Sequence, residues 1–288
     1  MLVILGPTAS GKSELAVKLA KKFNGEVVSA DSRQVYKGLD IGSGKITRRE
    51  MRGVRHHLLD VASPRGLFTA ARYRALARRA VWDILRRGKL PIVAGGTGLY
   101  IDALLYDSPL PTVAPDPKLR ARLEKKSAAE LYARLKKLDP RRAGNIESKN
   151  KHRLVRALEI VLKTGRPVPE QPERKPIYDT LKIGIALPPE VLKKRIRARL
   201  AKRLKQGMLQ EVHKLHEAGV SWKRLDDLGL EYRHASRYLR GLISREEMVR
   251  TIEGESWKYA RRQMTWWRKD KGIRWIKSAS DLALKKIS

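Results

Sequence analysis

The chain has 288 residues, no cysteine, and 64 Lys and Arg against 30 Asp and Glu, which gives a formal net charge of +34. The lack of thiols excludes disulfides, thiol catalysis and cysteine-ligated zinc. No apolar run has the length of a membrane helix and no signal-peptide pattern precedes the first strand, so we expect a cytoplasmic protein without membrane contact. The charge favours nucleic acid as a partner, because a phosphate backbone can neutralise many cations. The alternatives are nonspecific association of the kind seen in ribosomal proteins, or a lineage whose proteins are generally basic.

A phosphate-binding loop follows the first predicted strand. Residues 6–13 read Gly-Pro-Thr-Ala-Ser-Gly-Lys-Ser, which matches G-x-x-x-x-G-K-[ST]. The apolar run 2–5 precedes this loop and the amphipathic stretch 14–22 follows it, in the order strand, turn, helix that the loop requires. Lys12 should reach terminal phosphate oxygens, and the Ser13 hydroxyl should bind Mg²⁺. The loop alone predicts a polyphosphate ligand without specifying a nucleotide or hydrolysis.

Strands and helices continue to alternate after the loop. Strands are predicted at 26–30 and 90–94, and helices at 68–87 and 99–105. This alternation predicts an α/β fold with a parallel sheet and crossover helices. Ligands of such sheets lie beyond the carboxyl ends of the strands. The phosphate loop and the ends of the next two strands should therefore meet at one crevice.

These two strand ends carry candidate site residues. Asp31 follows strand 26–30, and three roles are open for it. It is a general base beside a substrate, a residue that hydrogen-bonds to a metal ligand, or part of a turn-capping Asp-Ser pair. The phosphate loop favours the functional interpretation. Thr97, within Gly95-Gly96-Thr97-Gly98, could offer its hydroxyl to a ligand or simply cap the next helix.

Proline-rich stretches divide the rest of the chain. They predict a helical insertion over 116–175 between two parts of an α/β core, 1–115 and 176–288. Within the insertion, 118–138 and 149–163 should be helical and basic. Beyond it we expect strands at 181–187 and 272–276 and helices at 189–205, 208–218, 230–240, 245–268 and 279–287.

Two of these helices carry further candidate residues. Arg195 and Arg199 lie four residues apart on one helix face and either clamp a pyrophosphate or are solvated. Residues 261–268 mix arginines with Trp266 and Trp267, where stacking on bases competes with a core role, and we favour the core.

Motifs along nearly the whole chain resemble those of tRNA dimethylallyltransferases, also called tRNA isopentenyltransferases. The resemblance is carried by the loop at 6–13 together with the segments 28–42, 53–60, 95–100, 152–159, 195–200, 206–212 and 260–268, in the family's order. The zinc-finger extension of some eukaryotic relatives requires cysteine. The chain therefore resembles the bacterial type.

The resemblance implies a P-loop NTPase-like parallel sheet flanked by helices, with a helical insertion domain. The implied reaction transfers a dimethylallyl group from dimethylallyl diphosphate to N6 of the adenosine on the 3′ side of the anticodon (position 37) and releases diphosphate. Its partners would be the anticodon stem-loop of tRNA and dimethylallyl diphosphate, its cofactor Mg²⁺, and its state a monomer. Whether ATP also binds the loop stays open.

The resemblance also assigns roles by position. Asp31 would be the general base at the adenine N6, with Thr8 and Arg199 as further catalytic residues and Arg195 as second choice for the diphosphate. Ser13 would lie near Mg²⁺. The diphosphate would be held by Gly6, Pro7, Thr8, Ala9, Ser10, Gly11, Lys12 and Ser13. The tRNA would contact Asp31, Ser32, Arg33, Gln34, Thr97, Arg120, His152, Arg153, Leu154, Val155 and Arg156.

Two other functions fit the loop and the charge. A small-molecule kinase on the same core would consume ATP and be indifferent to RNA, which the charge disfavours. A non-catalytic RNA-binding protein would use the loop only as an anion site. Substituting Asp31 separates this last possibility from an enzyme.

Overall fold

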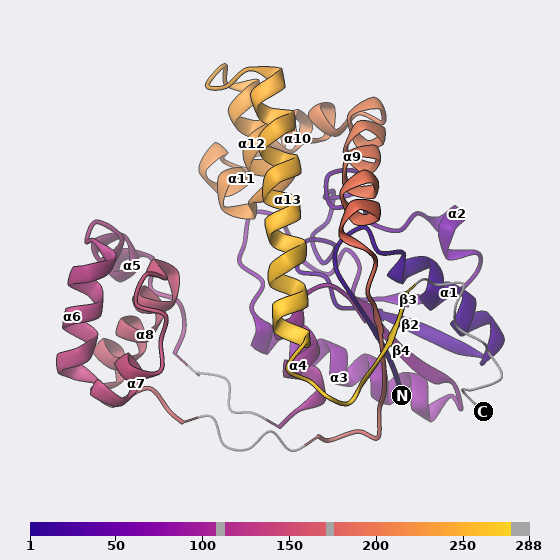
Figure 1. Cartoon of the computed structure of the whole chain (residues 1–288), viewed down its shortest axis with the longest axis horizontal. Helices are drawn as coiled ribbons and strands as arrows, with labels where there is room; N and C mark the ends of the chain where they lie inside the picture. The colour runs from indigo at the N-terminus through magenta and orange to yellow at the C-terminus, as the bar shows by residue number, and fades with distance from the viewer. Residues whose placement is uncertain (108–112, 171–175, 278–288) are drawn as a thin grey trace. The chain divides into compact units, whose positions relative to one another are not determined.

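The computed structural model describes residues 1–107, 113–170 and 176–277. Its six strands form one sheet in which every pairing is parallel, as the alternating sequence pattern predicts (Figure 1). The strand order is β3-β2-β4-β1-β5-β6. The strands are β1 (Leu2–Leu5), β2 (Gly25–Ser29), β3 (His56–His57), β4 (Leu90–Gly95), β5 (Leu181–Ile185) and β6 (Ile273–Ile276).

Helices cover both faces of the sheet because side chains alternate along each strand. Ile4 of β1 packs with Leu15 and Leu19 of α1 (Lys12–Lys22) on one face. Its neighbours Val3 and Leu5 belong to the core on the other face, which α3 (Ala70–Arg86) and α4 (Gly98–Leu105) cover. β1 lies between β4 and β5, so the loop that follows it starts from the middle of the sheet.

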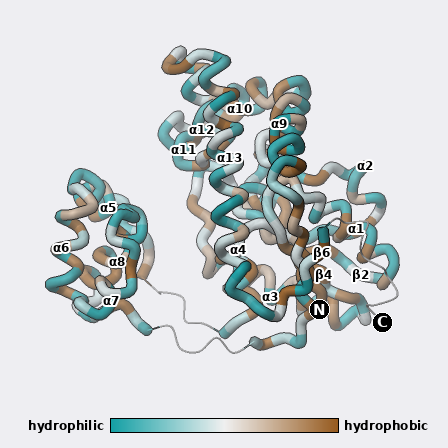
Figure 2. The backbone as a smooth tube through the Cα atoms, in the orientation of Figure 1, coloured by the Kyte–Doolittle hydropathy of each residue, from teal (hydrophilic) through white to brown (hydrophobic). Residues whose placement is uncertain are grey.

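A group of helices follows β5 along the chain and joins the same core. Met208, Val212 and Tyr232 are buried in the cluster that contains Val3 and Leu5. α9 and α13 pack side by side and carry long hydrophilic stretches, teal in Figure 2. These helices are α9 (Pro189–Lys205), α10 (Met208–Glu217), α11 (Trp222–Leu228), α12 (Leu230–Leu239) and α13 (Arg245–Trp267).

Residues 107–175 form a second compact unit, whereas 1–106 and 176–288 form the first. The second unit has its own core, to which Leu131, Leu135 and Leu158 contribute. Its helices are α5 (Pro117–Glu124), α6 (Ala128–Leu138), α7 (Pro140–Gly144) and α8 (Lys151–Thr164). The sequence prediction placed the boundary at 115/116. Residues 113–115 belong with the helices, because the Arg156 guanidinium donates to the Val113 carbonyl oxygen at 2.9 Å.

The elements that differ from prediction have local causes. The predicted helix at 118–138 is two helices, because Ser127 and Glu130 form a capping box that starts α6. The short elements α2 (Arg48–Met51), β3, α7 and α11 were not predicted. The predicted helix 279–287 lies outside the described residues. Within residues 1–107, 113–170 and 176–277, no helix combines the length and the apolar character needed to cross a bilayer.

Candidate active site

The phosphate-binding loop joins the end of β1 to the start of α1. Gly6 has a φ of +151°, and a Cβ atom there would lie 2.8 Å from the Ile185 carbonyl oxygen, so a side chain does not fit. Gly11 has a φ of +95° and directly precedes the helix. The Lys12 ammonium folds back over the loop and donates to the Pro7 carbonyl oxygen at 2.7 Å.

The ends of β1, β2 and β4 meet at one cavity of about 590 Å³, as expected for the carboxyl edge of a parallel sheet. The helices α9 and α13 and the segment before α2 complete its wall. Among the predicted site residues, those that line it are Thr8, Ala9, Ser10, Gly11, Lys12, Ser13, Asp31, Gln34 and Arg199. Gly6 and Pro7 are buried behind them.

Asp31 is held at the cavity by the turn that it caps. Its Oδ1 accepts hydrogen bonds from the backbone N–H groups of Arg33, at 2.8 Å, and Gln34, at 3.3 Å. The turn-capping interpretation is therefore correct for one oxygen. Asp31 also lines the cavity together with Lys12 and Arg199, and its negative charge opposes the lowering of the pKa of both. Capping and a functional role are compatible at this residue.

Both arginines of the predicted pair face the phosphate loop from α9. The Arg199 Nη2 atom donates to the Thr8 hydroxyl at 2.6 Å, and Arg199 lines the cavity. The Arg195 Nη1 atom lies 3.4 Å from the Ser10 carbonyl oxygen, and its side chain is otherwise exposed. Burial, together with the smaller effect of repulsion by Arg203, lowers the pKa of Arg199 to about 10, although Glu231 and Asp31 oppose the shift. Arg199 is thus the arginine placed to meet a ligand.

The cavity is suited to an anion. Burial lowers the pKa of Lys12 to about 7, although Asp31 opposes the shift. The Ser10 hydroxyl is buried and has no hydrogen-bond partner in the part of the chain that the structure describes. A phosphate oxygen at the loop would supply such a partner and would favour the charged form of Lys12.

Two residues of α13 complete the site, and the sequence did not point to either. The Gln263 Oε1 atom accepts from the Thr8 backbone N–H at 2.8 Å, and its Nε2 atom donates to the Gly96 carbonyl oxygen at 2.7 Å. Gln263 therefore links the phosphate loop to the end of β4. One turn earlier, the Tyr259 hydroxyl hydrogen-bonds to the Thr97 side chain, and burial raises the pKa of Tyr259 to about 12.

In the sequence, the segment 261–268 stands out for its arginines and tryptophans rather than for this glutamine. Trp267 is buried, as predicted. Trp266 is 39% exposed, and its Nε1 atom donates to Asp102 at 3.1 Å. The aromatic pair is therefore divided between the core and the surface.

Gln263→Glu is expected to weaken the binding of inorganic diphosphate by about 10- to 100-fold, the cost of an unmatched buried polar contact. The carboxylate would place an acceptor against the Gly96 carbonyl oxygen, where the amide now donates. Titration calorimetry measures the loss. Gln210→Glu, at an exposed position of α10, is the control. Equal affinities of Q263E and Q210E would show that this link does not shape the loop.

Comparison with known proteins identifies the family. The family model described as IPP transferase matches residues 34–270. The chain belongs to the IPP transferase family. This membership confirms the resemblance seen in the sequence motifs. The matched range begins after the phosphate loop at 6–13, so the loop supports the assignment to this family separately from the family model.

Relatives of this transferase match along most of their length. This chain is 44% identical over 274 residues to the tRNA dimethylallyltransferase of Roseiflexus sp. (strain RS-1), and the match covers 93% of this chain and 90% of that protein. It is 39% identical over 285 residues to that of Anoxybacillus flavithermus (strain DSM 21510 / WK1), covering 98% of this chain and 91% of that protein.

Solved structures also resemble this transferase. The tRNA isopentenylpyrophosphate transferase of Bacillus halodurans superposes with a TM-score of 0.74 at 36% identity, covering 99% of this chain and 92% of that one. A eukaryotic dimethylallyltransferase acting on tRNA superposes with a TM-score of 0.81 at 30% identity, covering 100% and 77%. The P-loop NTPase-like fold expected from the sequence is confirmed.

Other predicted tRNA contacts of the transferase lie near the cavity but outside its lining. The Thr97 hydroxyl accepts from the Ser32 backbone N–H at 3.0 Å, which joins the end of β4 to the Asp31 turn. The Arg33 Nη1 atom lies 3.3 Å from the Ser32 carbonyl oxygen. Their contact with tRNA remains a prediction.

The remaining predicted tRNA contacts of the transferase belong to the second unit. Arg120 and Arg156 both pair with Glu159, at 2.7 Å and 2.5 Å. Burial opposes ionisation of Glu159, but hydrogen bonds from Arg120, the Asp116 backbone and Arg156 outweigh it and lower the pKa of Glu159 to about 2. These arginines therefore also stabilise the unit.

Helix α8 separates its predicted tRNA contacts into two groups. Leu154 and Val155 are buried in the core of the second unit, so their side chains serve packing there. His152 and Arg153 are exposed at the start of α8. Direct tRNA contact by this helix stays a prediction, and His152 and Arg153 are the members of the predicted set whose side chains are exposed.

Proposed function

We propose that the chain transfers a dimethylallyl group from dimethylallyl diphosphate to N6 of the adenosine on the 3′ side of the tRNA anticodon. The observation that carries this proposal is one cavity that joins a phosphate loop and two enclosed cations, Lys12 and Arg199, to the carboxylate of Asp31. The adenine N6 attacks the first carbon of the dimethylallyl group, the carbon–oxygen bond to diphosphate breaks, and Asp31 accepts the proton that N6 loses.

The loop serves as a holder for the leaving group. Negative charge grows on the diphosphate as the carbon–oxygen bond breaks, and cations already in place stabilise it without reorganisation. Lys12 and Arg199 supply these cations, and Thr8 orients Arg199 through its hydroxyl. No phosphoryl group is transferred, so the loop does not require ATP.

The oxygen donors of the cavity fit Mg²⁺. This ion is usually held by one or two protein oxygens together with substrate phosphates. Within the described residues no group of three or more His, Asp or Glu side chains forms a complete protein cage, whereas the Ser13 hydroxyl and Asp31 both line the cavity. Ser13 would hold Mg²⁺, which neutralises diphosphate charge when bound.

The proposed macromolecular substrate is the anticodon stem-loop of tRNA. A net charge of +34 suits a phosphate backbone, and the target base must leave its stack to enter the cavity. Ser32, Arg33, Gln34 and Thr97 adjoin Asp31 and would guide the nucleotides next to the target. We further propose that the protein is a cytoplasmic monomer, in keeping with a tRNA substrate.

The test combines purified protein, dimethylallyl diphosphate, Mg²⁺ and a synthetic anticodon stem-loop. We expect the RNA to gain the mass of one dimethylallyl group, and no gain when the target adenosine is replaced by purine riboside, which lacks N6. The tRNA affinity should fall by about 1,000-fold or more between about 50 and 200 mM salt, if six or more phosphates are contacted. Transfer of the ATP γ-phosphate to a small molecule, with no mass gain on RNA, would instead indicate a kinase.

A further inference from the structure

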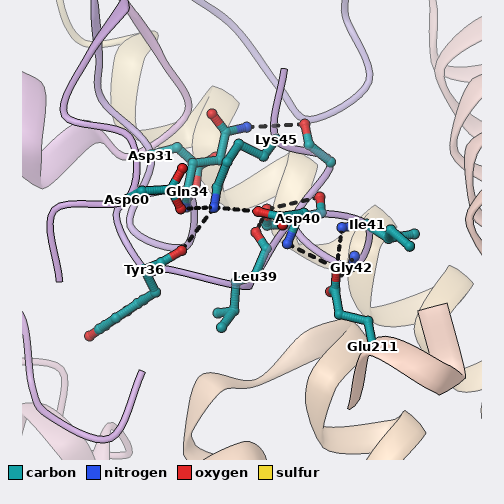
Figure 3. A network of polar contacts seen from close by, with 12 residues as sticks. Asp31, Gln34, Tyr36, Leu39, Asp40, Ile41, Gly42, Lys45, Asp60 and Glu211 are labelled. Atoms are coloured by element: carbon teal, nitrogen blue, oxygen red, sulfur yellow. Dashed lines mark hydrogen bonds and ion pairs between the residues drawn. The ribbon is translucent and has the colours of Figure 1, made fainter. Parts of the chain in front are cut away.

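A carboxylate outside the cavity holds one of the cavity's walls. Glu211, on α10, accepts hydrogen bonds from three consecutive backbone N–H groups, at 3.0 Å from Asp40, 2.5 Å from Ile41 and 3.0 Å from Gly42 (Figure 3). These groups belong to the segment of residues 40–46, which we name the clamp loop. Three parallel N–H groups form a concave anion site, and here the protein fills that site with its own carboxylate.

The next residue of the clamp loop is tied to the same carboxylate indirectly. The Ser43 backbone N–H donates to the Tyr232 hydroxyl at 3.1 Å, and that hydroxyl donates to Glu211 at 2.8 Å. Tyr232 is 1% exposed. A Cβ atom on Gly42 would lie 2.7 Å from the Tyr232 ring, so only glycine permits this approach. The loop is therefore packed closely against α10 and α12.

A buried lysine fixes the other end of the clamp loop. The Lys45 ammonium contacts carboxylate oxygens of Asp40, at 2.6 Å, and Asp60, at 2.5 Å, and donates to the Tyr36 carbonyl oxygen at 2.9 Å (Figure 3). Only 6% of the Lys45 side chain is exposed. Three oxygen partners satisfy all three donors of the ammonium. Both ends of the loop are thus fixed.

The clamp loop reaches the active site through Gln34. Ser43, Gly44 and Ile46 line the cavity. The Gly44 carbonyl oxygen accepts from the Gln34 Nε2 atom at 3.2 Å, and the Gln34 backbone N–H donates to Asp31 Oδ1 at 3.3 Å. A continuous set of contacts therefore runs from Glu211 through the loop to the proposed general base.

We propose that Glu211 is a positioning residue that holds the clamp loop, and through Gly44 and Gln34 orients the Asp31 carboxylate toward the substrate amine. The inference rests on the proposed function. Only an acceptor with no hydrogens of its own can receive four donors on two oxygens. A glutamine would turn its NH₂ group toward at least one of these N–H groups and leave it unmatched.

Glu211→Gln tests the role, with Glu217→Gln as the matched control on the same helix, where the side chain is exposed. In E211Q we expect kcat to fall by about 10- to 50-fold, the cost of one unmatched donor. The KM for dimethylallyl diphosphate should stay within about twofold, because Glu211 does not touch the phosphate loop. Amide hydrogen exchange at residues 40–43 should accelerate. E217Q should match the wild type in all three.

A double-mutant cycle with Gln34→Ala shows whether the effect passes through Gln34. We expect E211Q to lower kcat little further in the Q34A background. Equal factors in both backgrounds would overturn the proposed route. Unchanged exchange at 40–43 in folded E211Q would overturn the loop-holding role. A wild type without transfer would instead refute the proposed function, and exchange would still report on the loop.

Tyr232→Phe provides a second variant in case E211Q does not fold. It removes only the hydroxyl, which bridges Ser43 and Glu211. A loss in kcat that is smaller than the loss expected for E211Q, together with faster amide exchange at Ser43 than in the wild type, supports the proposal. Wild-type kcat and exchange in Y232F would contradict it.

Discussion

Asp31→Asn is expected to lower the rate of dimethylallyl transfer by about 1,000-fold, within the range that a general base contributes. Asparagine keeps an Oδ1 atom that can accept from the Arg33 and Gln34 backbone N–H groups, so the turn should survive. It cannot take the proton from N6. The affinity for tRNA should remain within about threefold, because one charge among many governs it little. Single-turnover rates and filter binding measure the two quantities.

Two further variants serve as controls for Asp31→Asn. Asp227→Asn, at a largely exposed position of α11, controls for a change in net charge. Asp31→Ala removes both the base and the turn cap, so a larger loss of tRNA affinity in D31A than in D31N would report the cap alone. Wild-type transfer by D31N would show that Asp31 is a turn residue and not the base.

The central fold could be predicted because its signals are local. The runs 2–5 and 90–94 are apolar, and 26–30 is apolar except for Glu26 and Ser29; all three are short and have glycine or a charged residue next to them, as expected of strands buried on both faces. β3 could not be predicted from the sequence, because it consists of only two residues, both histidine. It is a strand only because these residues pair with Val27 and Val28. The division of 118–138 into two helices required weighing a capping box against a continuous helical pattern.

The residues of the candidate site also fall into those that the sequence predicts and those that it does not. The phosphate loop and Asp31 are visible in the sequence because each follows a strand end, and Arg199 is visible through its spacing from Arg195. Gln263 and Glu211 act through contacts with Thr8 and Ile41, which lie 255 and 170 positions away in the chain. No local pattern encodes such distant pairs. The motifs that contain both residues nevertheless lay within the family resemblance.

Lys12→Met is expected to lower the transfer rate by about 100- to 1,000-fold, the usual effect of removing one group that stabilises developing charge. Methionine retains most of the side-chain volume but cannot contact the leaving diphosphate. Lys18→Met, at an exposed position on the same helix, is the control. A K12M protein that retains wild-type transfer would show that Arg199 and the loop backbone suffice for the leaving group.

Lys12 should also make diphosphate binding depend on pH. Burial lowers the pKa of Lys12 to about 7, with Asp31 opposing and Arg199 adding to the shift, and a bound diphosphate raises it again. Above pH 7 the free protein is mostly uncharged at this residue and must take up a proton on binding. Relative to that of K12M, the affinity for inorganic diphosphate should therefore fall as the pH rises toward about 9, by at most about tenfold per pH unit, and change less below pH 7.

Inorganic diphosphate also loses a proton at alkaline pH, so K12M, which binds the same ligand without the ammonium, is the reference for the ligand's own titration. Calorimetry in two buffers of different ionisation enthalpy counts the protons exchanged. At alkaline pH the wild type should take up close to one proton more per diphosphate than K12M does. If both proteins show the same uptake and the same slope, another group near the loop titrates, and Lys12 enters the binding reaction already charged.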